Sequence, residues 1–259
     1  VGNWQPENYR KKYLGPVALE TALALSLNTI SVKLVLQLGP EAVAAVAHRL
    51  GIVSPLGTDA SIALGTSEVT PLELVSAYAP FANGGIRVQP QIIARVRTAK
   101  GKLLYQRKGA SFGRVIEPAH VGMMNAMLQE TLVIGTAKHA ELPGWQAAGK
   151  TGTSQDYRDA WFVGYTSQLV TGVWLGNDDN SPTRKTSGGN LPVNIWSKYM
   201  RAALHGVPPT PLPGAARGAD PGVGLPPADI GATGPQAQRD PIGEMIAPVR
   251  ERNFFEKLF

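Results

Sequence analysis

The sequence predicts an α+β fold, in which an antiparallel sheet is flanked by helices. Two observations support this class: helical apolar patterns fill most of the first half, and three strand patterns follow one another between Trp145 and Leu175. Helices and strands that occur in separate runs are typical of α+β proteins, whereas α/β proteins alternate them. The sequence shows no βαβ alternation and no glycine-rich phosphate loop. A chain of 259 residues can bury a sizeable core.

The expected helices are marked by prolines at their first positions and by glycines after their ends. Proline is tolerated at the first helical position because its missing N–H would have no partner inside the helix. Thr70-Pro71-Leu72-Glu73 adds a capping box, in which the threonine and glutamate side chains satisfy free backbone N–H groups. Helical patterns cover Val17–Leu38 with an interruption at Ser26-Leu27-Asn28, Pro40–Leu50 before Gly51, Pro71 to Asn83-Gly84-Gly85, and Pro118–Leu132.

The clearest strand patterns form a meander. Trp145–Ser154, Asp159–Tyr165 and Leu169–Leu175 are the three candidate strands, and a short turn joins the last two. Because short turns join antiparallel neighbours, we expect these strands to pair in chain order. The remaining expected elements are a helix over Pro192–Leu204, which would cover one face of the sheet, and a β segment over Ile86–Arg107, which would turn at Lys100-Gly101.

The composition changes near Gly206, where we place a domain boundary. Residues 206–242 contain 9 prolines and 7 glycines in 37 positions, so this stretch cannot bury enough apolar surface to offset its ordering entropy. Residues 1–205 carry 20 Lys+Arg and 13 Asp+Glu, a net charge of +7, whereas residues 206–259 carry 5 and 6, a net charge of −1. We expect a folded domain over 1–205 and a disordered Pro/Gly-rich tail over 206–259.

Composition also excludes several classes of site. Cysteine is absent, which excludes disulfides and thiolate metal sites. The basic surface (pI about 9.6) contains no run interleaved with aromatics, so no nucleic-acid partner is expected. No apolar stretch reaches the roughly 18 residues of a membrane span. No metal and no cofactor are expected, because metal-ligand spacing is absent among His48, His120, His139 and His205.

The strongest signal for chemistry is Lys150-Thr151-Gly152-Thr153, on the first strand of the meander. Alternation puts Lys150 and Gly152 on one face and Thr151 and Thr153 on the other. A lysine beside hydroxyls and a glycine that admits another backbone could bind an extended peptide by strand addition and fix its terminal carboxylate. An edge strand that carries a charge against aggregation has the same pattern, so the tripeptide alone leaves both interpretations open.

The second motif, Ser26-Leu27-Asn28, interrupts an apolar helical pattern and so places two polar groups near a buried region. Serine and asparagine are also common at helix boundaries, because their side chains compete for backbone hydrogen bonds. Ser-x-Asn followed by Lys-Thr-Gly matches two of the three motifs of penicillin-binding proteins and class A β-lactamases, of which Ser-x-x-Lys is the third.

Further segments resemble the transpeptidase domain of class A (bifunctional) penicillin-binding proteins, over roughly residues 3–205. The resemblance implies the fold shared by penicillin-binding proteins and serine β-lactamases, with an α-helical subdomain. The segments that carry it are Pro6-Glu7-Asn8-Tyr9, Ala22 to Thr29, Ala63 to Leu74, Phe81-Ala82-Asn83-Gly84-Gly85, Ala148 to Thr153, and Asp159 to Tyr165.

The resemblance also implies roles for the two motifs. Ser26 would belong to the hydrogen-bond network that moves a proton to the leaving amine. Asn28 would hold the substrate amide and an upstream lysine, and Lys150 would supply positive potential and orient Ser26. The implied substrate-binding residues are Thr151, Gly152 and Thr153; the two threonines would bind the terminal carboxylate, and the Thr153 N–H would form half of the oxyanion hole.

The third motif is absent from these 259 residues, because no serine is followed by lysine three positions later. Ser111 and Ser181 come nearest, with Arg114 and Arg184, and arginine stays protonated and cannot act as a base. In the family the acylated serine precedes the Ser-x-Asn motif, so we expect it upstream of Val1. We therefore expect this chain to be part of a longer protein, to lack the N-terminal part of the fold, and to be inactive alone.

For that longer protein the resemblance implies a serine-type D,D-transpeptidase or carboxypeptidase of peptidoglycan synthesis. Its partners would be D-Ala-D-Ala stem peptides and β-lactams, and it would also be a glycosyltransferase, anchored at the periplasmic face of the bacterial inner membrane. Two alternatives remain open. One is a catalytically inert scaffold or binding relative; the other is a class A-type β-lactamase, for whose deacylating base no candidate carboxylate is found.

Overall fold

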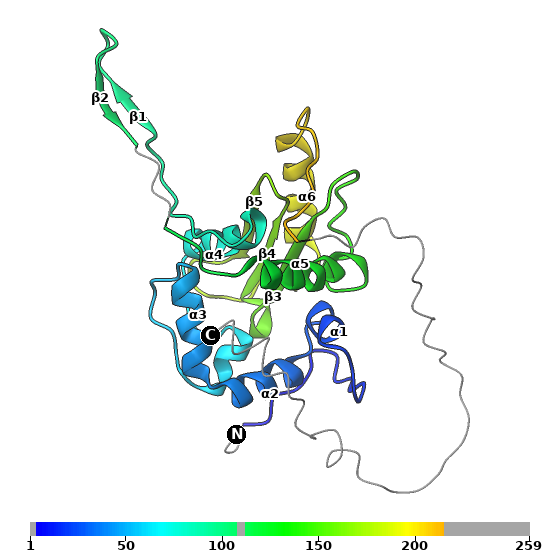
Figure 1. Ribbon diagram of the computed structural model, residues 1–259. Helices are drawn as coiled ribbons and strands as arrows, with labels where there is room; N and C mark the ends of the chain where they lie inside the picture. The colour runs from blue at the N-terminus through cyan, green and yellow to red at the C-terminus, as the bar shows by residue number, and fades with distance from the viewer. Residues whose placement is uncertain (1–3, 108–111, 215–259) are drawn as a thin grey trace, which may run out of the picture.

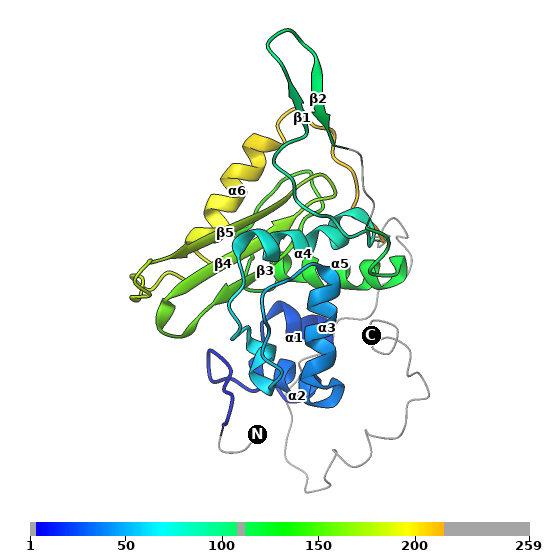
Figure 2. The same cartoon turned by 90° about the vertical axis from the view of Figure 1, so that its left-hand side faces the viewer.

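The structure is a computed structural model that describes residues 4–107 and 112–214. A three-stranded antiparallel sheet lies at its centre, with helices on both faces and a group of helices beside one end (Figures 1 and 2). The predicted α+β class is confirmed. In chain order the elements are α1 (Leu19–Ala24), α2 (Asn28–Leu38), α3 (Pro40–Leu50), η1 (Ala60–Leu64), α4 (Pro71–Asn83), β1 (Arg95–Arg97), β2 (Leu103–Gln106), α5 (Pro118–Val133), β3 (Ala148–Thr153), η2 (Gln155–Tyr157), β4 (Asp159–Tyr165), β5 (Val170–Gly176) and α6 (Leu191–Ala203).

Helices α1, α2 and α3 form the group beside the sheet. The helical pattern breaks where the sequence predicts, since α1 ends at Ala24 and α2 begins at Asn28. Helices α2 and α3 meet at an angle of 97°, and Gly39 between them has a φ of 89°, a value that glycine adopts without strain. Within residues 4–107 and 112–214, no single helix is long and apolar enough to cross a membrane, and this bent pair passes that test only when its two helices are combined.

The capping box predicted at Thr70 is present and also fixes the preceding loop. The Glu73 carboxylate accepts hydrogen bonds from the N–H groups of Thr70 at 3.0 Å and of Val53 and Ser54 at 2.8 Å each. Hydrogen bonds from the side chains of Ser54 and Thr70 hold the pKa of this carboxyl well below its usual range. One ionised side chain therefore sets both the start of α4 and the course of the chain that leads into it.

Strands β3, β4 and β5 pair in the predicted order, and cross-strand partners show which face each residue occupies. Lys150 lies opposite Val163, whereas Thr151 lies opposite Phe162. Helices α4 and α5 pack on the face that carries Val163 and Tyr165, and α6 packs on the other face. Lys150 therefore points toward the α4–α5 side.

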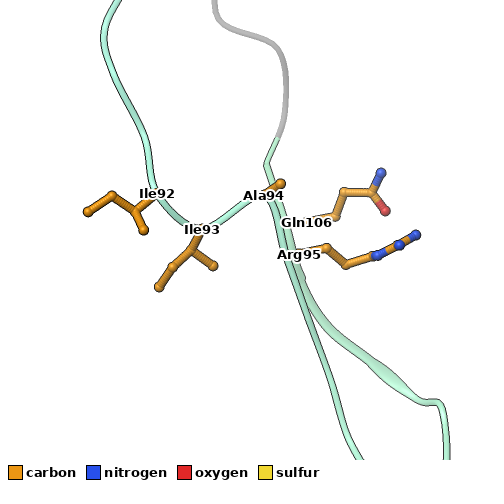
Figure 3. Close-up of a pocket in the computed structure, with 5 residues that line it drawn as sticks. All are labelled: Ile92, Ile93, Ala94, Arg95 and Gln106. Carbon is orange, nitrogen blue, oxygen red and sulfur yellow. The ribbon is translucent and has the colours of Figure 1, made fainter. Parts of the chain in front are cut away.

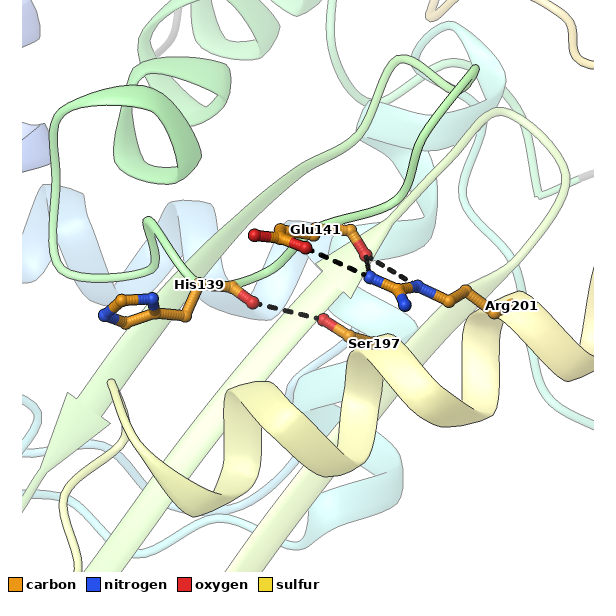
Figure 4. A network of polar contacts seen from close by, with 4 residues as sticks. All are labelled: His139, Glu141, Ser197 and Arg201. Atoms are coloured by element: carbon orange, nitrogen blue, oxygen red, sulfur yellow. Dashed lines mark hydrogen bonds and ion pairs between the residues drawn. The ribbon is translucent and has the colours of Figure 1, made fainter.

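Helix α6 is held on its face of the sheet by aromatic packing and by polar contacts. Trp196 stacks edge-on against Phe162 with ring centroids 5.2 Å apart, and its indole N–H donates to the carbonyl of Gly164 at 3.0 Å. A Cβ at Gly164 would lie 2.7 Å from the Trp196 ring, so glycine is required there. At the other side of the helix, Arg201 donates to the carbonyl of Glu141 and pairs with its carboxylate at 3.3 Å (Figure 4).

A buried amide joins four parts of the molecule on the α4–α5 side. Asn125 of α5 is fully buried; its Nδ2 donates to the carbonyls of Phe81 at 3.0 Å and Pro213 at 2.9 Å. Its Oδ1 accepts from the hydroxyl of Tyr165 at 2.7 Å. The amide is thus satisfied by α4, β4 and the segment that follows α6.

That segment follows residue 206, where the sequence predicts a boundary, and its described part packs on the domain. Leu212 is buried in the cluster that also holds Ala148 and Tyr165, and its N–H donates to Gln146 Oε1 at 2.9 Å. The turn between β4 and β5 bonds to Thr210 through Ser167. The prolines keep this segment out of helices and strands, so it runs extended over the domain surface. Leu212 nevertheless buries its side chain in the domain. Residues 215–259 of the predicted tail lie outside the described residues.

The predicted β segment over Ile86–Arg107 is shorter in the structure. It forms a two-stranded hairpin of β1 and β2 that turns near Lys100-Gly101 and projects from the domain (Figures 1 and 2). All seven of its strand residues are exposed.

We predict that Tyr165→Phe lowers the free energy of unfolding by about 1–3 kcal/mol, because it leaves the buried Oδ1 of Asn125 without its donor. Denaturant titration measures the loss. Tyr199→Phe is the matched control, since the Tyr199 ring is 52% exposed and its hydroxyl loss should cost less than about 0.5 kcal/mol. Equal stabilities of the two variants would contradict a structural role for the buried amide.

Candidate active site

The two sequence motifs meet at one hydrogen bond. Nζ of Lys150 donates to Oγ of Ser26 at 2.9 Å, although the residues are 124 positions apart in the chain. The same Nζ donates to the carbonyl of Thr151 at 3.0 Å. The hydrogen of the Ser26 hydroxyl is then free to point elsewhere, because its oxygen already accepts from the lysine.

Burial lowers the pKa of Lys150 to about 8. The cause is desolvation, which disfavours the charged ammonium in surroundings of low dielectric. Near neutral pH the lysine is therefore still mostly protonated, but it releases its proton far more easily than a surface lysine. Such a group can both attract a carboxylate and take part in proton transfer.

Ser26 lies in a tight turn between α1 and α2. Its φ of 54° is in the left-handed region, which costs a non-glycine residue about 1–2 kcal/mol. Two backbone hydrogen bonds hold the turn, from Ser26 N–H to Leu23 O at 3.1 Å and from Leu27 N–H to Ala22 O at 3.0 Å. The strained residue carries the motif's hydroxyl and directs it at Lys150, so the strain is located at the candidate site.

Asn28, the third residue of the first motif, is the first residue of α2, and its Nδ2 donates to the carbonyl of Glu7 at 2.9 Å. The next residue, Thr29, donates through both its N–H and its hydroxyl to Asn8 Oδ1 at 3.2 Å. The segment around Glu7 and Asn8 is thereby tied to the start of α2. The contacts place Asn28 next to this segment, and they place Ser26 beside Lys150.

Thr151 and Thr153 lie on the face opposite Lys150, as strand alternation predicts, and each hydroxyl has a partner. Oγ1 of Thr151 is 2.5 Å from Oγ1 of Thr136, and Oγ1 of Thr153 accepts from the N–H of Gly188 at 3.0 Å. A ligand carboxylate would have to exchange with these partners. The structure therefore does not gather all of the predicted residues on one side of the strand.

Gly152, between the two threonines, lies beneath a second glycine. A Cβ at Gly188 would lie 2.5 Å from Gly152 O and 2.3 Å from Trp161 O, so this loop packs directly on β3 and β4. The loop after β5 reaches the motif strand because position 188 lacks a side chain, whereas a Cβ at Gly152 would face the Trp161 side chain at 3.4 Å.

Thr136 is a positioning residue that sequence reasoning missed. Its N–H donates to Ala24 O at the end of α1, at 3.1 Å, and its hydroxyl meets Thr151. It thus connects the turn that carries Ser26 with the strand that carries Lys150. The one sequence feature at this position is the preceding Gly135. The structure explains it, because a Cβ at Gly135 would lie 2.3 Å from Ala24 O and would block the approach of this loop to α1.

A second connection between the two motifs is formed by a pair of tyrosines. The hydroxyls of Tyr9 and Tyr157 are 2.6 Å apart, and their rings pack edge to face. Tyr9 follows the segment that is bonded to α2, and Tyr157 lies just beyond the end of β3. No sequence pattern indicated this contact, because the residues are 148 positions apart.

The comparison with protein families decides the affiliation. The model of the penicillin-binding protein transpeptidase domain matches residues 1–200. This chain belongs to the penicillin-binding protein transpeptidase family. The predicted resemblance to this family is therefore confirmed.

Curated relatives are named penicillin-binding protein 1A. That of Neisseria lactamica is 37% identical over 212 residues, which are 79% of this chain and 27% of the relative. That of Aquifex aeolicus is 38% identical over 207 residues, which are 80% of this chain and 28% of the relative. The chain spans little more than a quarter of the length of these relatives.

Solved penicillin-binding proteins share the fold. Penicillin-binding protein 1A from Haemophilus influenzae matches with a TM-score of 0.75 and 27% identity, covering 81% of this chain and 38% of that one. The PonA1 protein from Mycobacterium tuberculosis in complex with penicillin V matches with a TM-score of 0.73 and 30% identity, covering 80% of this chain and 61% of that one. The transpeptidase fold predicted from the sequence is confirmed.

We predict that raising the pH stabilises the protein relative to Lys150→Met. An unfolded lysine titrates near about 10.4, and the folded pKa is about 8, so the unfolded chain binds more protons between these values. The cost of the buried charge is thus fully present below about pH 8 and is lost as the pH rises toward about 10.

Free energies of unfolding for both proteins, measured near pH 7 and near pH 10, test this sign. From pH 7 to pH 10, the free energy of unfolding of the unsubstituted protein should rise relative to that of Lys150→Met. Lys198→Met is the control and should show no such change relative to the unsubstituted protein, because Lys198 is exposed on α6. A difference that stays constant with pH would contradict a desolvated Lys150.

Proposed function

We propose that the longer protein containing this chain is a serine-type D,D-transpeptidase of peptidoglycan synthesis. The observation that carries the proposal is the hydrogen bond between Lys150 and Ser26, beside an edge strand. A buried lysine of lowered pKa that bonds a serine hydroxyl is an arrangement suited to proton transfer during acyl transfer. Family membership supplies the reaction class.

The donor substrate is a stem peptide that ends in D-Ala-D-Ala. It adds to the free edge of β3, since β3 is the outer strand of the sheet among the described residues. Its terminal carboxylate is attracted by the Lys150 ammonium and exchanges with the present partners of Thr151 and Thr153, while Gly152 permits the close backbone approach. The amide of Asn28 leaves the carbonyl of Glu7 and bonds the substrate amide.

Reaction begins at a serine upstream of this chain. Its oxygen attacks the carbonyl carbon of the penultimate D-alanine, and the bond to the terminal D-alanine nitrogen breaks. The serine proton passes to an upstream lysine and then, through Ser26, to the leaving nitrogen. Lys150 holds the Ser26 oxygen, so the Ser26 hydrogen is directed at that nitrogen. The Thr153 N–H forms half of the oxyanion hole.

The amine of a second stem peptide then attacks the acyl-enzyme and forms the cross-link; water in its place gives carboxypeptidase activity. A β-lactam presents a carboxylate and a strained amide to the same residues, and it leaves the serine acylated. The length of the 1A relatives supports a longer protein, for which we propose a glycosyltransferase domain and an anchor that holds it at the periplasmic face of the inner membrane.

We predict that Ser26→Ala and Lys150→Ala each slow acylation of the complete protein by a fluorescent penicillin by about 100-fold, the size of a lost proton-transfer group. Stopped-flow labelling measures the rate constant. Ser76→Ala is the matched control, because the Ser76 hydroxyl donates to Leu72 O in an exposed hydrogen bond within α4, and its loss should leave the rate unchanged. Unchanged rates in both site variants would reject the proposed relay.

The 259-residue chain alone, by contrast, is predicted not to be labelled at all. It contains no Ser-x-x-Lys pair, so no serine in it has the lysine that would activate it. Gel fluorescence and intact mass after incubation with the same penicillin provide the measurement. Stoichiometric labelling would mean that a serine of this chain is the nucleophile.

A further inference from the structure

The β1–β2 hairpin has the surface properties of a docking site. Figures 1 and 2 show it projecting from the α4 end of the domain, on the side opposite α2. It is a sheet of two strands, so within the described residues each strand has an outer row of backbone groups without a neighbouring strand. A two-stranded hairpin alone is marginally stable in water, and a third strand would stabilise it.

The hairpin exposes apolar side chains on both of its strands. Val96 at 38% and Tyr105 at 45% exposure are cross-strand partners and share a face. Leu103 at 44% and Leu104 at 61% exposure lie where the pairing is irregular, opposite the step from Val96 to Arg97. At its base, Ile92 is 99% exposed. Apolar side chains are thus presented to solvent next to open strand edges.

The charge of this region is uniform. Residues 86–116 contain eight Lys and Arg and no Asp or Glu, a net charge of +8, whereas the whole chain carries +6. The described ion pairs of the molecule involve Lys11, Arg158 and Arg201, and none of them involves a hairpin residue. A binding partner for this surface is therefore anionic.

A shallow pocket of about 480 Å³ lies where the hairpin leaves the domain (Figure 3). Ile92, Ile93, Ala94, Arg95 and Gln106 line it, and Arg95 and Gln106 point to the same side of the ladder. The side chains of Ile92 and Ile93 point to the other side, so this segment offers apolar contact on one side and a guanidinium on the other.

We propose that the hairpin binds an extended acidic segment of a partner protein, which adds as a third strand. The partner's backbone pairs with a free edge, its carboxylates meet Arg95 and Lys102, and its alternate apolar side chains cover the exposed apolar side chains of the hairpin. A lipid surface fits less well, because insertion would place the open strand edges in hydrocarbon, where their backbone groups have no partner. This inference does not rest on the proposed catalytic function.

The test uses the complete protein and a fluorescent peptide of about six residues, the usual length of a strand, that alternates Glu and Val. Fluorescence anisotropy should show binding that weakens with rising salt. Arg95→Glu/Lys102→Glu should weaken it by about tenfold or more, through two reversed charge pairs. Lys33→Glu/Lys198→Glu, with the same change in net charge at exposed helix positions, should bind like the unsubstituted protein.

A second probe separates strand pairing from simple charge attraction. The same peptide with alternate amides N-methylated keeps its carboxylates but cannot pair with a strand, so it should not bind. The far-ultraviolet circular dichroism spectrum and the thermal unfolding midpoint should be unchanged in both double variants, which verifies folding. The proposal is overturned if the methylated peptide binds equally well, if the hairpin variant binds as tightly as the control, or if vesicles containing phosphatidylglycerol bind and the peptide does not.

Discussion

The contact between Lys150 and Ser26 is the interaction on which the site depends. An ammonium that is removed from water loses solvation, and hydrogen bonds to Ser26 and to the Thr151 carbonyl offset part of that loss. The remainder appears as the lowered pKa of Lys150. Burial of the Lys150 ammonium lowers the stability of the folded protein, and it also makes the ammonium release its proton more easily. The loss of stability and the proposed proton transfer therefore have one physical cause.

Two connections hold the partners of this contact in place. Thr136 bonds α1 and β3 at once, and the tyrosine pair joins the segment before α1 to the turn after β3. The sheet itself is fixed by α6, whose Trp196 fits only against a glycine at position 164. Rigid packing on both faces thus sets the separation between a strand and a turn that are 124 positions apart.

Local signals in the sequence were sufficient for most elements. The capping box at Thr70 predicted the start of α4, Gly51 marked the end of α3, and the meander pattern predicted β4 with its exact bounds. Contacts between distant residues could not be predicted from local pattern, and these include Thr136, the tyrosine pair and the packing of Leu212. The packing of Leu212 lies beyond the predicted boundary, and Pro-rich composition could not indicate it, because composition does not report how a single side chain of an extended segment docks on a folded domain.

The sequence placed Ser26 and Lys150 in one site only through the family resemblance. The structure shows directly that the two side chains are hydrogen-bonded. A crystal structure of the complete protein acylated by a penicillin would test the relay most directly. The Ser26 oxygen should lie within about 3 Å of both Lys150 Nζ and the nitrogen of the opened ring, with the ligand beside the β3 edge. An acyl-enzyme in which Ser26 is separated from that nitrogen by more than about 5 Å, without a bridging water, would contradict the proposed path of the proton.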